Sequence, residues 1–122
     1  MSDLERHREL AKEKRAAAID EYGKGRYTVV GDLAIKAVEQ AIEALASLEN
    51  LHFHIRPRSA HANRIKWIKK KFPNLSKYVD MLWGAYGVLG YEGTNGERAK
   101  KALEAMEVIL NELERESGIR FK

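Results

Sequence analysis

Hydrophobic residues recur every three or four positions along most of the chain, which is the period of an amphipathic α-helix. The clearest case is segment 29–49, where Val30, Leu33, Ala37 and Ala41 fall on one face. No segment shows the two-residue alternation of a half-buried strand, although residues 27–30 are briefly rich in β-formers. The pattern predicts five helices, covering residues 3–22, 29–49, 60–72, 75–90 and 95–116.

Residues that favour helix ends separate these segments. Ser2 and Thr94 each stand three positions before a glutamate, which is the spacing of a capping box. Ser59 is expected to cap the third helix, while Asn50 and Gly118 are expected to end the second and the last. We therefore expect an all-α fold, an up-and-down four-helix bundle with one additional short helix, in a single domain.

The composition narrows the class of protein. With 122 residues, 44% of them hydrophobic and 33% charged, the chain suits one folded domain with its own core. It has no cysteine, which excludes disulfides, thiolate zinc sites, iron–sulfur clusters and a cysteine nucleophile. The uncharged stretch 81–91 is far shorter than the roughly 20 residues that span a bilayer. The charged N-terminus is unlike a signal peptide, so we expect a cytoplasmic protein with no membrane contact.

Positive charge is concentrated in one part of the chain. Residues 50–79 contain eight lysines and arginines and no acidic residue, whereas the whole chain carries a formal net charge of only +4. Such a window favours an anionic partner, because each phosphate that it neutralises releases a counterion. The candidate nucleic-acid- or anion-binding residues are Arg56, Arg58, Arg64, Lys66, Trp67, Lys69, Lys70, Lys71 and Lys77.

Two interpretations of this basic window stay open. Trp67 beside several lysines is typical of surfaces that stack on and neutralise single-stranded RNA. Alternatively, the lysines form ion pairs with glutamates of the bundle such as Glu104, Glu107 and Glu112, and Trp67 is partly buried. Glu39 raises a related question, since it is either on an exposed flank or turned inward toward a basic residue of another helix.

Three histidines, His52, His54 and His61, lie within the basic window. Imidazoles bind zinc or nickel, but no carboxylate follows them within ten residues, so we expect no metal and no cofactor. Arg56 and His61 are the weak candidates for a catalytic pair: a guanidinium can hold a phosphate while an imidazole moves a proton in metal-free RNA cleavage. Because their spacing alone does not define a site, we predict no catalytic residue beyond this pair.

Glycines recur every third residue on the fourth predicted helix, at Gly84, Gly87 and Gly90. Each disfavours a helix interior, so the three indicate close packing against another backbone, within the chain or across a dimer. Because Trp83 adds an apolar side chain beside them, we expect these four residues to form a homodimer interface.

Several segments together resemble HEPN domains. The run 32–45 is similar to the alanine-spaced second helix of that family, and 57–61 resembles its proline–histidine step before the third helix. Segments 86–91 and 97–107 resemble its last two helices. The likeness covers roughly residues 5–115.

The resemblance implies a bundle of four or five helices that is usually a homodimer and acts on or with RNA or nucleotides. Many members are ribonuclease toxins paired with a nucleotidyltransferase antitoxin. Their catalytic signature is an arginine followed four to six residues later by a histidine, near the end of the penultimate long helix. Residues 83–91 occupy that place here and contain neither. We therefore expect a non-catalytic HEPN-like protein that binds RNA, a nucleotide or a nucleotidyltransferase-type partner through its basic face. The alternatives are a metal-independent ribonuclease using Arg56 and His61, and a plain dimeric interaction module.

Overall fold

The computed structural model of the chain describes every residue except Met1 and residues 93–95, and the side chains of 85–92 are also left undescribed. The described part is helical and contains no strand, which confirms the all-α prediction. The elements are α1 (Asp3–Gly23), α2 (Tyr27–Ser47), α3 (Pro57–Lys71), α4 (Ser76–Glu92) and α5 (Gly96–Ser117), with 3-10 turns η1 (Phe53–Ile55) and η2 (Pro73–Leu75).

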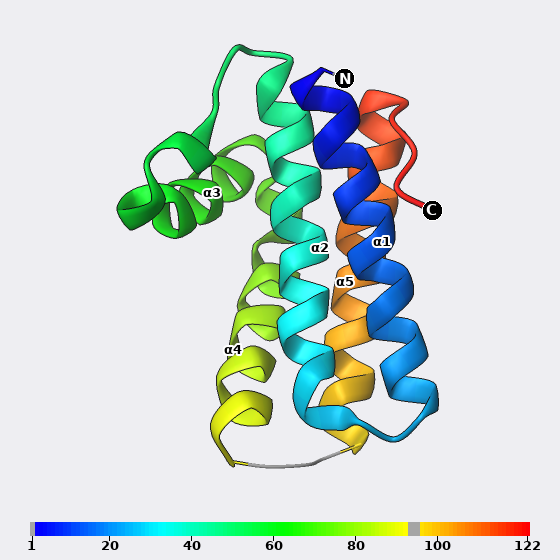
Figure 1. Cartoon of the computed structure of the whole chain (residues 1–122). Helices are drawn as coiled ribbons and strands as arrows, with labels where there is room; N and C mark the ends of the chain where they lie inside the picture. Colours follow the sequence, from blue (N-terminus) through cyan, green and yellow to red (C-terminus); the bar gives the residue numbers. More distant parts are fainter. Residues whose placement is uncertain (1, 93–95) are drawn as a thin grey trace.

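Four of the helices form a bundle and the fifth stands beside it. Figure 1 shows α1, α2, α4 and α5 running up and down next to one another, with α3 projecting from the side of α2. Helix α2 occupies the middle, because it contacts α1, α4 and α5 and also touches α3. The expected bundle with one additional helix is therefore present.

The core is lined by the predicted apolar stripes of α2 and α5. Ala34, Ala37, Ala41 and Ala44 of α2 have no solvent exposure, as is true of Leu110 on α5. Alanine on a packed face lets a neighbouring helix backbone approach closely. This close approach explains how α2 can contact three long helices at once.

The predicted helix ends are mostly confirmed. Ser2 Oγ accepts a hydrogen bond from the Glu5 backbone N–H at 3.2 Å, as an N-cap does. Asn50 adopts a left-handed φ of 59° after α2, and Gly118 adopts a φ of 76° after α5. The Gly118 N–H donates to the Glu114 carbonyl, which is typical of a glycine that ends a helix. The capping box predicted at Thr94 lies outside the described residues.

Two predicted helix starts are wrong. Helix α3 begins at Pro57 instead of residue 60, so Arg56 and not Ser59 is its N-cap residue. Proline is well suited to the first position of a helix, since its missing N–H has no intrahelical partner there. Helix α2 begins at Tyr27 instead of residue 29, so the β-prone run forms its first turn, with Tyr22 and Tyr27 rings 5.6 Å apart.

None of the described helices combines the length and the apolar character that crossing a membrane requires.

Candidate functional site

Two glutamates on the central helix point toward α3. Glu39 and Glu43 are four residues apart on α2 and therefore lie on the same face, one turn from each other. The Glu43 side chain is only 1% exposed and that of Glu39 is 12% exposed. A carboxylate buried to this degree needs charged or hydrogen-bonding partners, and α3 supplies them.

Arg64 of α3 holds both carboxylates. Its Nε donates to Glu43 Oε2 at 2.6 Å and its Nη1 donates to Glu39 Oε2 at 2.8 Å. The other oxygen of Glu43, Oε1, accepts the backbone N–H of His54 at 3.3 Å. The inward orientation considered for Glu39 is therefore confirmed, while Glu43 was not singled out in the sequence.

His61 shares the Glu39 carboxylate with Arg64. Its Nδ1 lies 2.8 Å from Glu39 Oε2, and Trp83 Nε1 lies 2.6 Å from its Nε2. An indole N–H can only donate, so Nε2 accepts and the proton of the neutral ring sits on Nδ1. Enzymes position a general-base histidine through such a carboxylate contact. In this chain the Trp83 N–H occupies the Nε2 lone pair, so that nitrogen is not available to accept a substrate proton.

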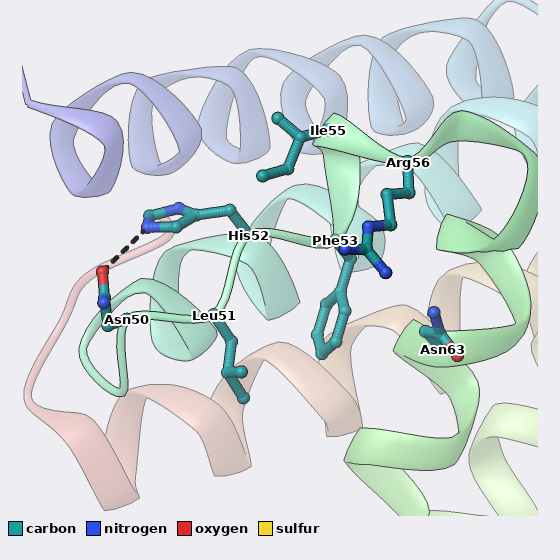
Figure 2. A pocket seen from close by; sticks show the side chains of 7 residues that line it. All are labelled: Asn50, Leu51, His52, Phe53, Ile55, Arg56 and Asn63. Carbon is teal, nitrogen blue, oxygen red and sulfur yellow. Dashed lines mark hydrogen bonds between the residues drawn. The ribbon is translucent and has the colours of Figure 1, made fainter.

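The structure does not place Arg56 with His61. Among the described residues, no hydrogen bond or ion pair joins the two side chains. Arg56 instead lines a pocket of about 290 Å³ with His52, Phe53 and Asn63. Figure 2 shows Arg56 at one end of this pocket and the His52–Asn50 hydrogen bond at the other. Arg64, which was assigned to anion binding in the sequence, is the arginine that approaches His61.

The basic window divides into paired and unpaired side chains. Besides Arg64, Lys69 pairs with Asp80 at 2.7 Å and Lys71 pairs with Glu49 at 2.6 Å. The other five cations make no ion pair with the described residues and are exposed: Arg56, Arg58, Lys66, Lys70 and Lys77. We call these five residues the unpaired basic set.

Trp67 is held by other rings. It packs edge-on against Phe53, with centroids 6.5 Å apart, and against Phe72 at 6.2 Å. Its indole Nε1 is buried and has no hydrogen-bond partner among the described residues. The partly buried alternative therefore describes Trp67, whose position is fixed by Phe53 and Phe72.

The predicted dimer interface is described only in part. Trp83 is half-buried and binds His61. Gly84 is exposed, and a methyl group added there would meet no neighbouring element within 4 Å in the described part of the chain. No described residue therefore packs closely against Gly84, and its role in a dimer stays a prediction. The surroundings of Gly87 and Gly90 lie outside the described residues.

His52 and His54 lie apart from His61, near the first turn of α1. Asp3 Oδ2 is 3.1 Å from His52 Nδ1 and 3.7 Å from His54 Nε2. The sequence shows no carboxylate shortly after these histidines, and Asp3, which approaches both of them, comes from the first turn of α1.

Comparisons with protein-family models, curated protein sequences and solved structures found no match. The HEPN resemblance therefore continues to depend on the segments quoted above.

Proposed function

We propose that this protein is a non-catalytic, HEPN-like RNA-binding protein that holds the phosphate backbone through the unpaired basic set. The observation that carries the proposal is that five exposed cations on and around α3 have no carboxylate partner in the described part of the chain. Three of the eight cations are already neutralised, so the binding surface is smaller than the sequence suggests.

The arrangement of α3 supports a polyanion as the ligand. Lys66 and Lys70 are four residues apart on α3. They therefore follow each other on one face of the helix, a little more than one turn apart along its axis. Arg58 lies in the first turn of the same helix, which contains no acidic residue. Because α3 projects from the side of the bundle, an extended strand can approach it from outside the four packed helices.

The state of Trp67 determines the mode of binding that we propose. Since Trp67 is partly buried and held by Phe53 and Phe72, we expect base stacking to contribute little and phosphate contacts to dominate. Such binding is nearly independent of sequence and weakens steeply with salt. For five phosphate contacts on a single strand, the slope of log K against log[salt] is about −3.5.

The same proposal includes a homodimer formed through the face of α4 that carries Gly84. It also includes a nucleotidyltransferase-type protein as a separate partner. It is supported by the exposure of Gly84 beside the aromatic Trp83 and by the HEPN resemblance.

The experiment measures binding of a fluorescein-labelled 20-nucleotide single-stranded RNA by anisotropy over a series of salt concentrations. Lys66→Gln/Lys70→Gln is expected to reduce the salt slope by about 1.4, corresponding to two lost phosphate contacts. Lys100→Gln/Lys101→Gln is the matched control, because it removes the same charge from exposed positions on α5. Equal losses in both double variants, or no binding by the wild type, would contradict the proposal.

A metal-independent ribonuclease is the second candidate, and the Glu39–His61 hydrogen bond is the observation that favours it. For His61 to act as a base, Trp83 must leave Nε2. Trp83→Phe is therefore expected to increase RNA cleavage in EDTA, and His61→Ala to abolish it. Cleavage that is unchanged in both variants, or absent throughout, rejects this candidate, and absence of both binding and cleavage leaves the plain interaction module.

A further inference from the structure

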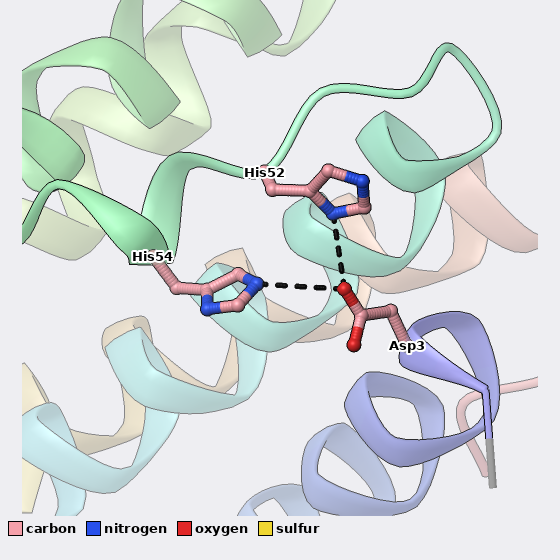
Figure 3. A group of neighbouring side chains, drawn as sticks. All are labelled: Asp3, His52 and His54. Carbon is pink, nitrogen blue, oxygen red and sulfur yellow. Dashed lines mark ion pairs between the residues drawn. The ribbon is translucent and has the colours of Figure 1, made fainter.

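Three histidines from distant parts of the sequence meet beside the first turn of α1. His52 and His54 come from the connection between α2 and α3, and His7 comes from α1. The rings of His7 and His54 are 4.8 Å apart, and those of His52 and His54 are 6.0 Å apart. Figure 3 shows His52 and His54 converging on the carboxylate of Asp3.

Each of these histidines has one buried ring nitrogen without a hydrogen-bond partner among the described residues. These atoms are His7 Nε2, His52 Nδ1 and His54 Nε2. His7 as a whole is only 4% exposed, so water does not solvate its free nitrogen. Unpaired buried polar atoms are rare in folded proteins, and three on neighbouring imidazoles point to a missing ligand.

The opposite nitrogens of two of the rings are already engaged. His7 Nδ1 lies 2.7 Å from the Gln40 amide oxygen, and His52 Nε2 lies 3.3 Å from that of Asn50. An amide oxygen only accepts, so these nitrogens carry the protons and leave lone pairs on His7 Nε2 and His52 Nδ1. Histidines that bind metals are oriented in this way, with the other ring N–H donated to an oxygen.

Asp3 supplies an oxygen to the same place. Arg6 binds Asp3 Oδ1 at 2.7 Å, which leaves Oδ2 to face the histidines. Oδ2 lies 3.1 Å from His52 Nδ1 and 3.7 Å from His54 Nε2. Ligand atoms bound about 2.0–2.2 Å from a tetrahedral zinc lie roughly 3.3–3.6 Å apart, close to these separations.

We propose that Asp3, His52 and His54 form a binding site for a divalent transition-metal ion, with the remaining coordination position left to water. A proton shared between Asp3 and His52 explains the site less well, since their 3.1 Å contact does not form a hydrogen bond. Imidazole nitrogens favour zinc, cobalt, nickel or copper, whereas calcium and magnesium prefer oxygen ligands. Glu43 is close to His7 and His54 but is committed to Arg64 and the His54 N–H.

The experiment uses the full chain without a polyhistidine tag, stripped with EDTA and dialysed against Zn²⁺, followed by elemental analysis. The wild type is expected to retain one zinc per chain, and Co²⁺ is expected to give the intense visible absorption of a tetrahedral site. His52→Ala and His54→Ala are each expected to weaken Zn²⁺ binding at least about tenfold. The chain has four histidines, so His61→Ala is the matched control and is expected to bind as the wild type does.

Circular dichroism of each variant separates loss of a ligand from loss of the fold. If His54→Ala does not fold, Asp3→Asn decides the question, because its side chain is 36% exposed and its replacement creates no buried cavity. The proposal is overturned if the wild type retains less than about one zinc per ten chains. It is also overturned if folded His52→Ala or Asp3→Asn binds Zn²⁺ as tightly as His61→Ala. RNA binding is not part of this assay, so its outcome is independent of the function proposed above.

Discussion

Replacing Arg64 should destabilise the fold through one identifiable interaction, the ion pair that it forms with the buried Glu39 and Glu43. Arg64→Met keeps the aliphatic stem but removes the cation between Glu39 and Glu43, of which the Glu43 side chain is 1% exposed. Removing one partner of a buried ion pair typically costs about 3–5 kcal/mol, because the other charge stays buried without compensation. His61 and the His54 N–H still contact these carboxylates, so we expect the lower end, about 3 kcal/mol.

The assay is urea unfolding followed by circular dichroism at neutral pH. Lys69→Met is the matched control, since its ion pair with Asp80 is largely exposed and is expected to contribute no more than about 1 kcal/mol. In a double-mutant cycle, Arg64→Met and Glu43→Gln should show a coupling of about 1–3 kcal/mol, because each removes the same contact. The reasoning is refuted if the free energies of unfolding of Arg64→Met and Lys69→Met differ by less than about 1 kcal/mol. It is also refuted if the effects of Arg64→Met and Glu43→Gln are additive, because the buried pair then does not hold α3.

Three further predictions concern other parts of the molecule. Gly84→Ala should raise the free energy of unfolding by about 0.5–1 kcal/mol, because alanine favours the helix and its methyl group would point into open space. Light scattering would show whether the substitution also weakens a dimer. A lower free energy of unfolding in a monomeric protein would contradict the reasoning. Phe121→Ala should cost about 3–5 kcal/mol in urea unfolding, since this ring is fully buried near the end of the chain, and a cost under about 1 kcal/mol would show that the tail is not docked. The Arg115 side chain, by hydrogen bonding to Glu112, lowers the pKa of that carboxyl, so Arg115→Gln should return the pKa toward its ordinary value in an NMR titration. Because the pKa of Glu112 is lower in the folded state than in the unfolded state, this contact stabilises the fold at pH values above the ordinary carboxyl pKa. The stabilisation is lost as the pH falls through the folded-state pKa. A Glu112 pKa that is the same in Arg115→Gln as in the wild type would refute this prediction.

Most of the helical architecture was predictable because it depends on local patterns. The three-to-four-residue periodicity and the capping residues place α1, α2, α4 and α5 within about two residues of their observed ends. The start of α3 is predicted too late because Ser59 is a favourable N-cap residue, whereas Pro57 occupies the first position of the helix.

The buried polar cluster was only half predictable. Spacing alone places Glu39 and Glu43 on one face of α2 but cannot say which neighbour that face meets. A signal was nevertheless present, since both glutamates stand among the apolar residues of segment 29–49 and the window 50–79 contains cations but no acidic residue. Arg64, a member of that window, provides the match.

The sequence places His52 and His54 close together but does not show that Asp3 and His7 join them. Asp3 and His7 are more than forty residues from His52 and His54, and they meet because α1 and α2 pack antiparallel, which brings the connection after α2 into contact with the first turns of α1. Metal-site patterns in sequences rely on short ligand spacings, which relate His52 to His54 but not to Asp3.

Glu43 joins the two regions to which we assign functions. One of its oxygens accepts the His54 backbone N–H in the histidine cluster, and the other accepts Arg64 Nε on the helix that carries most of the unpaired basic set. The η1 turn between these contacts has no fully buried residue, so polar contacts and the half-buried Phe53 hold it to the bundle. A change at Glu43 should therefore disturb metal binding and RNA binding together. Substitutions at His52 or at Lys66 and Lys70 leave Glu43 and Arg64 intact, which is why they can test the two proposals separately.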